Sequence, residues 1–323
     1  MATARPSGIG SSPAGGQTVA RRELRWPAKE LTGDNGGRVE GKPSRTALVT
    51  AAARAAHLIV DRPPWIFEDT LAEALMGEAG SALIALHRQD PTTPRLASLR
   101  VAICTRSRYS EHRVAAAVDR DVRQYVILGA GLDSFAYRAE VPGDVWVFEV
   151  DHSVTQAWKQ QRLAAAAIPI PSRVRFVPVD FTVDSLAQQL CEQGFDRSRP
   201  VIVSWLGVTQ YLSVEAIRST LLALGSLGPP VELVMTYVLP DELRDQSTDK
   251  PWAEFFMPGA AAVGEPWITF FTPEDIDRLI EQAGMTIIEN VGGKDSIEPS
   301  LWQRSDALVP HELPRLVWAS TAA

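Results

Sequence analysis

The distribution of apolar residues divides the chain near residue 120. Behind Ser44, a residue with N-cap chemistry, small and apolar residues repeat at helical intervals as far as residue 59. The same periodicity returns at 71–86 and at 99–118, with a proline-rich break at 90–94 between them. No run in this region alternates as a strand does, so the pattern predicts a helical cap segment over 44–120.

After residue 120, short β-rich runs alternate with helical stretches. The predicted strands are 125–128, 145–150, 174–179, 201–203 and 231–238, with two closing strands at 285–291 and 313–320. Capping residues predict where helices begin between them: Ser153, Thr182, Ser213 and Thr272. Strands that alternate with crossover helices are typical of an α/β domain with a parallel sheet, which we place at 121–323.

One connection in this domain is long and rich in aromatic residues. It covers 240–271 and contains Trp252, Phe255, Phe256, Trp267, Phe270 and Phe271. Long connections of this kind are often lids or pocket walls. The alternative is that the rings only cover the edge of the sheet, because most aromatic residues serve packing.

Composition and net charge argue against several kinds of protein function and predict a tail before the helices. Residues 1–43 hold eight of the 22 glycines and four prolines without apolar periodicity, which predicts a disordered tail. The net charge is −7, so nucleic acid is not an expected partner. No apolar run reaches the roughly 18 residues of a membrane span, and no signal-peptide core is present, so we expect a cytoplasmic protein.

Disulfide and metal chemistry are also disfavoured. The two cysteines, Cys104 and Cys191, form no CxxC motif, and none of the five histidines stands at ligand spacing from another. We therefore expect neither a disulfide framework nor a metal site.

The strongest chemical signal is a glycine turn after the first strand of the α/β domain. Gly129 and Gly131 leave the backbone free of side chains, as in a nucleotide site at the edge of an α/β sheet. A dinucleotide fingerprint requires a third glycine where this chain has Ser134. The carboxylate of Asp133 would also repel a pyrophosphate, so a ligand with an ammonium group fits the turn better.

Acidic residues end the next two strands. At Asp151 a carboxylate can accept hydrogen bonds from both hydroxyls of a ribose, and Glu149 lies on the same side of the strand. Asp180 could accept a bond from an adenine amino group while Phe181 packs against the ring. Either aspartate could instead cap the helix that follows it, and the residues alone leave both interpretations open.

Together these segments resemble the leucine carboxyl methyltransferase family, a branch of the class I S-adenosylmethionine-dependent methyltransferases. The segments are 128–138 (LGAGLDSFAYR), 148–151 (FEVD) with Trp158 and Lys159, 179–180 and 205–212 (WLGVTQYL). The resemblance extends from Ser44 to the C-terminus. It implies a Rossmann-like sheet of seven strands, mostly parallel with an antiparallel last strand, and S-adenosylmethionine as the cofactor.

The resemblance also implies which residues contact this cofactor. At the strand ends these are Gly129, Ala130, Gly131, Asp133, Asp151, Asp180, Phe181 and Leu206. An arginine of the helix before the glycine turn would bind the cofactor carboxylate, which a guanidinium can pair with through two hydrogen bonds. Arg108 is the best match and Arg106 the alternative; the competing interpretation is an arginine that only projects into solvent.

Leu206 departs from the family pattern. Members that act on a phosphatase carry a glutamate after the fourth strand, and a leucine there removes an acceptor from the cofactor site. The departure argues against the family's protein substrate and favours a small-molecule acceptor. Residues expected to line the acceptor pocket are Trp205, Tyr211, Trp252, Phe255 and Trp267, although Trp205 and Tyr211 could equally be core aromatics.

The resulting hypothesis is an S-adenosylmethionine-dependent O-methyltransferase that acts on a carboxylate or hydroxyl of a small metabolite. A carboxylate is ionised at neutral pH and needs no base, whereas a phenol would benefit from one. We nominate no base, because His57 and His112 are explained as ordinary helix residues, and this favours a carboxylate. The alternatives are carboxyl methylation of a protein C-terminus, a nicotinamide-dependent oxidoreductase and a binding protein without activity.

Overall fold

In the computed structural model, which describes residues 1, 44–140, 142–228 and 230–322, seven strands form one sheet. They are β1 (Gln124–Leu128), β2 (Trp146–Asp151), β3 (Val174–Pro178), β4 (Val201–Trp205), β5 (Val231–Tyr237), β6 (Thr286–Val291) and β7 (Arg315–Ser320). Their spatial order is β3-β2-β1-β4-β5-β7-β6. The first five pair in parallel, and β7 runs antiparallel to both β5 and β6, which confirms the predicted fold class.

The central strand β1 brings three strand ends together. All of its residues are buried, as expected for a parallel strand covered on both faces. Leu128 pairs with Val150 of β2 and with Trp205 of β4. The carboxyl ends of these strands therefore share one edge, which is where open α/β sheets bind ligands.

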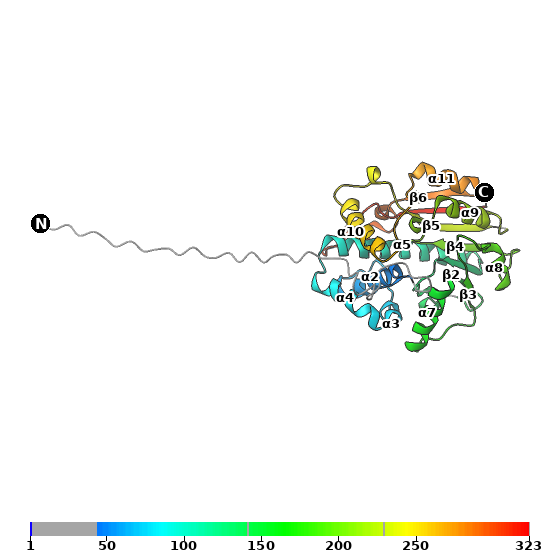
Figure 1. The fold of residues 1–323 in the computed structure, drawn as a ribbon, viewed down its shortest axis with the longest axis horizontal. Helices are drawn as coiled ribbons and strands as arrows, with labels where there is room; N and C mark the ends of the chain where they lie inside the picture. The colour runs from blue at the N-terminus through cyan, green and yellow to red at the C-terminus, as the bar shows by residue number, and fades with distance from the viewer. Residues whose placement is uncertain (2–43, 141, 229, 323) are drawn as a thin grey trace.

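Helices precede the sheet in the chain. They are α2 (Thr46–Val60), α3 (Ala72–Met76), α4 (Glu78–Gln89) and α5 (Pro94–Asp119), and the described part of 44–120 contains no strand. Helix α2 packs against α3, α4 and α5, and Figure 1 shows α2, α3 and α4 gathered beside the sheet. The predicted tail lies outside the described residues, apart from Met1.

All but the first of the crossover helices begin at a residue whose side chain caps them. They are α6 (Phe135–Arg138), α7 (Ser153–Ala165), α8 (Leu186–Glu192), α9 (Val214–Gly225) and α11 (Pro273–Gln282). Two predicted caps are confirmed, because Ser213 accepts the N–H of Ala216 and Thr272 accepts the N–H of Asp275. Each satisfies a backbone donor in the first turn of its helix.

Two predicted caps are wrong. His152, rather than Ser153, caps α7, and Ser185, rather than Thr182, caps α8. The hydroxyl of Thr182 donates instead to Oδ1 of Asp180 at 2.6 Å. This local turn delays the start of the helix, because the side chain that could have capped it is already engaged.

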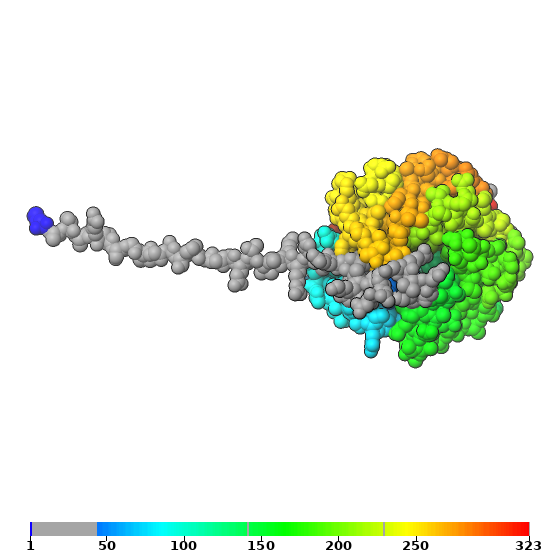
Figure 2. All heavy atoms as spheres, viewed as in Figure 1, coloured from blue at the N-terminus to red at the C-terminus, as the bar shows by residue number. Residues whose placement is uncertain are grey.

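The aromatic connection between β5 and α11 contains a helix that the sequence pattern did not predict. This is α10 (Asp249–Ala262), which packs against α5. Figure 2 shows the yellow atoms of this part of the chain at the surface, beside the cyan atoms of the N-terminal helices. Residues 263–271 connect α10 to α11, and we call them the strap.

Within the described ranges, no helix has both the length and the apolar composition that crossing a bilayer requires. The same residues contain no group of three or more His, Cys, Asp or Glu side chains that could hold a metal ion.

Candidate functional site

The turn after β1 requires glycine at its first position. Gly129 has φ +69°, and a Cβ there would lie 2.3 Å from Cγ2 of Val208. The N–H groups of Gly129 and Ala130 both donate to the carbonyl of Val150, at 2.8 and 3.0 Å, which fastens the turn to β2. Gly131 is left-handed as well, with φ +46°. The turn therefore presents bare backbone at the sheet edge.

Asp151 joins this turn to the end of β2. Its Oδ2 accepts the N–H of Gly131 at 2.7 Å, and its Oδ1 accepts the N–H of His152 at 2.7 Å. Burial raises the pKa of Asp151, and the two N–H donors oppose the rise because they favour the ionised form. Each carboxylate oxygen can accept a second hydrogen bond. The protein thus orients this carboxylate and leaves it acceptor capacity for a ligand.

Glu149, the second acidic candidate on β2, is enclosed. Its Oε2 lies 2.7 Å from Nζ of Lys159, and both side chains are 1% exposed. Burial raises the pKa of Glu149, while the charge of Lys159 opposes the rise. Of the two acidic residues, only Asp151 therefore lies at the tip of the strand.

Asp133 is held close to the glycine turn. Its Oδ1 accepts the N–H of Phe135 at 2.8 Å, at the start of α6, and its own N–H donates to the carbonyl of Ala130 at 2.7 Å. The residue is half-buried. The fold thus fixes a carboxylate beside the turn, where a ligand with an ammonium group would be favoured.

Asp180 and Phe181 follow β3. Oδ1 of Asp180 accepts the N–H and the hydroxyl of Thr182, at 2.9 and 2.6 Å. The ring of Phe181 lies 6.2 Å from that of Trp205, the last residue of β4. Because β2 and β1 separate β3 from β4 in the sheet, Phe181 reaches across the ends of two strands.

Arg108, the arginine favoured from the sequence, is engaged in an ion pair. Its Nε lies 3.0 Å from Oε2 of Glu298, and its Nη1 donates to the carbonyl of Ile66 at 3.2 Å. The side chain is 26% exposed. Its charge is thus already matched by a carboxylate within the chain.

Arg106 lies at the sheet edge instead. Residues two apart on a helix face different directions, so the two arginines of α5 cannot serve the same site. Its guanidinium lies against Gly207, just beyond β4, and burial lowers its pKa to about 10. Among the described residues it makes no hydrogen bond and no ion pair. The structure therefore places an unneutralised cation here.

Trp205 and Leu206 differ in surroundings although they are adjacent. Trp205 is fully buried, and its indole N–H has no hydrogen-bond partner in the described part of the chain. Leu206 is half-buried and packs with Tyr109, Val234 and Leu316. Its side chain therefore contributes apolar packing between α5, β5 and β7.

Tyr211 lies where three segments meet. It ends a short 3-10 turn, Thr209–Tyr211, that follows β4. Burial raises the pKa of its phenol, and this rise is opposed by Trp267 of the strap, Thr46 of α2 and the charge of Arg106. The phenol is therefore close to polar groups from the strap, from α2 and from α5.

Glu265 of the strap caps α2. Its carboxylate oxygens accept the N–H groups of Arg45 and Thr46, at 3.3 and 2.9 Å, and no side chain at the N-cap of α2 does so. A Cβ on Gly131 would lie 3.2 Å from that of Ala47, in the same turn of α2. No sequence motif indicates the role of Glu265, because that role depends on contact between segments that are distant in the chain.

The structure separates the predicted aromatic pocket residues. Trp252 and Trp267 are buried with ring centres 5.4 Å apart, and their indole N–H groups have no hydrogen-bond partner among the described residues. Phe255 lies under the guanidinium of Arg95, whose Cζ is 5.4 Å from the ring centre. It therefore contributes to the contact between α10 and α5.

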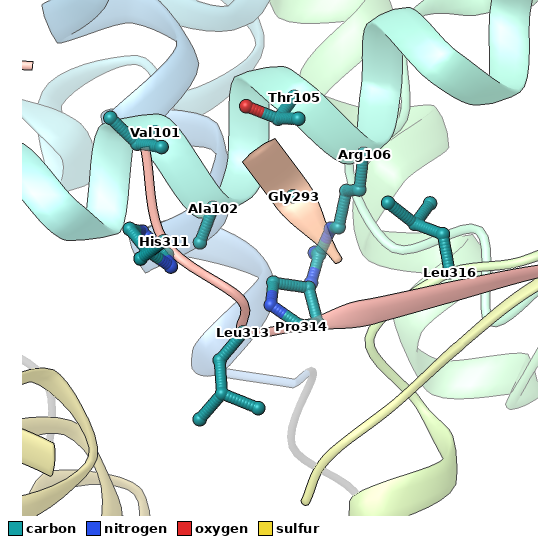
Figure 3. A pocket seen from close by; sticks show the side chains of 9 residues that line it. All are labelled: Val101, Ala102, Thr105, Arg106, Gly293, His311, Leu313, Pro314 and Leu316. Carbon is teal, nitrogen blue, oxygen red and sulfur yellow. The ribbon is translucent and has the colours of Figure 1, made fainter. Parts of the chain in front are cut away.

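A narrow pocket, too tight to hold a water molecule, lies between α5 and the start of β7. Figure 3 shows the side chain of Arg106 extending from α5 toward Pro314 in this pocket. Two other lining residues, Thr105 and His311, each have a buried polar atom without a hydrogen-bond partner in the described chain. Of the residues considered from the sequence as ligand contacts, Arg106 alone lines this pocket.

Comparison with known proteins agrees with the sequence motifs. Residues 47–225 match the family model of the leucine carboxyl methyltransferases. YktD of Bacillus subtilis (strain 168), described as a candidate S-adenosyl-L-methionine-dependent methyltransferase, is 31% identical over 294 residues, or 84% of this chain and 96% of the relative. A candidate methyltransferase of the same description from Parafrankia sp. (strain EAN1pec) is 31% identical over 242 residues, or 69% and 74% of the two chains.

A solved structure shares the fold. It is a candidate methyltransferase from Thermobifida fusca YX, with a TM-score of 0.55 at 18% identity, covering 87% of this chain and 95% of that one. The family model matches more than half of this chain, and YktD is similar over nearly its whole length. The chain therefore belongs to the leucine carboxyl methyltransferase family.

Proposed function

We propose that this chain binds S-adenosylmethionine at the edge formed by the glycine turn and transfers its methyl group to a carboxylate or hydroxyl of a small molecule. The observation that carries the proposal is the hydrogen bond from the N–H of Gly131 to Asp151. It brings bare backbone and an oriented carboxylate to one place. The descriptions of the relatives from Bacillus subtilis and Parafrankia support this choice of cofactor.

The residues present fit this cofactor. The guanidinium of Arg106, with no partner among the described residues, suits the carboxylate of an amino acid. The charge of Asp133 suits the ammonium group, and the spare acceptor capacity of Asp151 suits the ribose hydroxyls. Asp180 and Phe181 suit the adenine, since one offers oxygen acceptors and the other an aromatic face.

We assign the carboxylate contact to Arg106 rather than to Arg108. The charge of Arg108 is matched by Glu298, whose carboxylate a second anion would have to displace. A carboxylate that binds Arg106 displaces no such partner, because Arg106 forms no ion pair with the described residues. A half-buried guanidinium without a counter-ion is unfavourable, and a carboxylate ligand would relieve this.

S-adenosylmethionine supplies a methyl group on a sulfonium, which an oxygen nucleophile can displace in line. The chain itself positions the reactants and excludes water. The strap contributes to this closure, because the N–H of Ile268 donates to the carbonyl of Gln210 at 2.8 Å and Glu265 holds α2. Tyr211, Trp252 and Trp267 remain the proposed lining of the acceptor pocket.

The histidines support a carboxylate acceptor over a phenol. Nδ1 of His57 lies 2.9 Å from Asp61, and its Nε2 accepts the N–H of Ile66, so both ring nitrogens already have partners. His112 is mostly exposed and lies 3.7 Å from Glu298. Neither is placed to serve as a base near Tyr211. A carboxylate needs only positioning, since it is already ionised at neutral pH.

Methyl-labelled S-adenosylmethionine tests the proposal directly. The protein is incubated with small carboxylic acids, phenols and a peptide that ends in leucine, and the products are separated and treated with mild base. We expect base-labile label on a small acid. Base-stable label on a phenol would assign hydroxyl methylation, and label on the peptide alone would assign a protein substrate. Binding of reduced nicotinamide dinucleotide in place of S-adenosylmethionine would overturn the proposal.

A further inference from the structure

The turn after β4 holds Gly207 in a left-handed conformation, with φ +70°. Its N–H donates to Oγ1 of Thr236 at 2.7 Å, and its carbonyl accepts Nε2 of Gln210 at 3.2 Å. Thr236 belongs to β5, so these bonds fix the turn to the neighbouring strand. Gly207 is therefore a rigid, side-chain-free position at the carboxyl end of the sheet.

The guanidinium of Arg106 covers this glycine. A Cβ on Gly207 would lie 2.3 Å from Nη1, 2.7 Å from Cζ and 2.7 Å from Nη2 of Arg106. The two terminal nitrogens and the central carbon of the guanidinium therefore occupy the space that a side chain at 207 would need. Because Gly207 has no side chain, the guanidinium can lie this close to the turn after β4.

Arg106, which is half-buried, differs from the two buried arginines of the N-terminal helices in how it is held. Nε of Arg54 lies 2.7 Å from Asp69, and Nε of Arg100 lies 2.7 Å from Asp61. The described residues give Arg106 no such partner. Its position must therefore come from packing, and Gly207 leaves the space in which the guanidinium lies.

We infer that Gly207 is a positioning residue, which orients the guanidinium of Arg106 toward the carboxylate that it binds. The inference rests on the proposed function, in which that carboxylate belongs to S-adenosylmethionine. A side chain at 207 would displace the end of a long, flexible arginine, which can rotate away without disrupting the core. The consequence of the clash with Arg106 is therefore expected in cofactor affinity, apart from the loss of stability that a left-handed backbone imposes on any side chain.

Gly207→Ala tests the inference, with Gly284→Ala as its matched control. Gly284 has φ +76°, and a Cβ there meets no atom within 4 Å, so the control carries the backbone strain alone. We expect similar losses of thermal stability in both variants. In calorimetric titration with S-adenosylmethionine, the dissociation constant should rise about tenfold or more in Gly207→Ala only. Equal dissociation constants in the two variants would overturn the inference.

Two arginine variants complete the design. In an Arg106→Ala background, Gly207→Ala should weaken binding no further, because the displaced group is absent. Arg106→Lys keeps the charge but lacks the flat group, so it should also bind about tenfold more weakly, and it does not depend on the folding of Gly207→Ala. Wild-type affinity in Arg106→Lys would overturn the inference. Wild-type affinity in Arg106→Ala would instead overturn the proposed role of Arg106 itself.

Discussion

The N–H of Gly131 donates to Oδ2 of Asp151 at 2.7 Å, and this bond joins the turn after β1 to the end of β2. The carboxylate that we assign to the ribose is thus oriented by the backbone that we assign to the methionine part of the cofactor. The two assignments depend on each other, since a change at either residue would disturb both contacts.

Truncation of Arg106 should weaken cofactor binding much more than truncation of Arg108. Arg106→Ala removes a charge-assisted pair and should raise the dissociation constant of S-adenosylmethionine at least about tenfold. Arg108→Ala breaks a partly exposed ion pair and should change it less than about twofold. Titration calorimetry on both variants checks this, and the reverse order would identify Arg108 as the anchor.

Glu265→Ala should loosen the first turn of α2. Loss of a helix cap costs about 0.5–2 kcal/mol of unfolding free energy, which urea denaturation can measure. Glu265→Gln keeps one acceptor oxygen and should lose less. Glu254→Ala, at an exposed position on α10, is the control. Amide exchange at 45–48 should accelerate in Glu265→Ala; unchanged exchange there would show that the carboxylate does not hold the helix.

Lys159→Met should be strongly destabilising. It leaves the carboxylate of Glu149, 1% exposed, without its partner, and breaking a buried pair in this way costs about 3–5 kcal/mol. The double variant Lys159→Met with Glu149→Gln should recover much of that loss of unfolding free energy. If the double variant were no more stable than Lys159→Met, the ion pair would not be the source of the effect.

His87 should make the fold less stable in acid. Burial and then the charge of Arg100 lower its pKa to about 3, from an ordinary 6.5. Below pH 6.5 the unfolded chain gains a proton at this residue that the folded chain does not accept until about pH 3. The contribution of His87 to the free energy of unfolding is therefore complete above pH 6.5. It is lost as the pH decreases, by up to about 1.4 kcal/mol per pH unit.

His87→Gln removes this titration and keeps an acceptor for Arg100. Urea denaturation between pH 7 and pH 4 should therefore show a shallower decline of unfolding free energy in the variant than in the wild type. Parallel declines would mean that the folded chain binds the proton as readily as the unfolded chain.

Features that depend on neighbouring residues could be predicted from the sequence. The glycine turn at Gly129, the caps Ser213 and Thr272 and the strand cores follow from local backbone chemistry and alternation. Helix α10 could not, because Pro258 and the adjacent glycine are typical helix breakers. Burial of Trp252 and its neighbouring rings against the core favours the helix in spite of them.

Features that depend on packing between distant segments required the structure. The sequence could not distinguish Arg106 from Arg108, because the rotation of α5 about its axis is set by its contacts with the sheet. Nor could it show that Lys159 encloses Glu149, although it did place Asp151 at the tip of the strand. Two residues of the same chemical type can be told apart only once the fold shows which of them reaches the site.

Calorimetric titration of S-adenosylmethionine into the wild type and into Asp151→Asn is the most direct test of the proposed site. Asp119→Asn, at an exposed position on α5, is the control. We predict one equivalent bound with equal affinity by the wild type and Asp119→Asn, and binding at least about tenfold weaker by a folded Asp151→Asn. Equal affinity in all three proteins, or no binding by the folded wild type, would contradict the assignment.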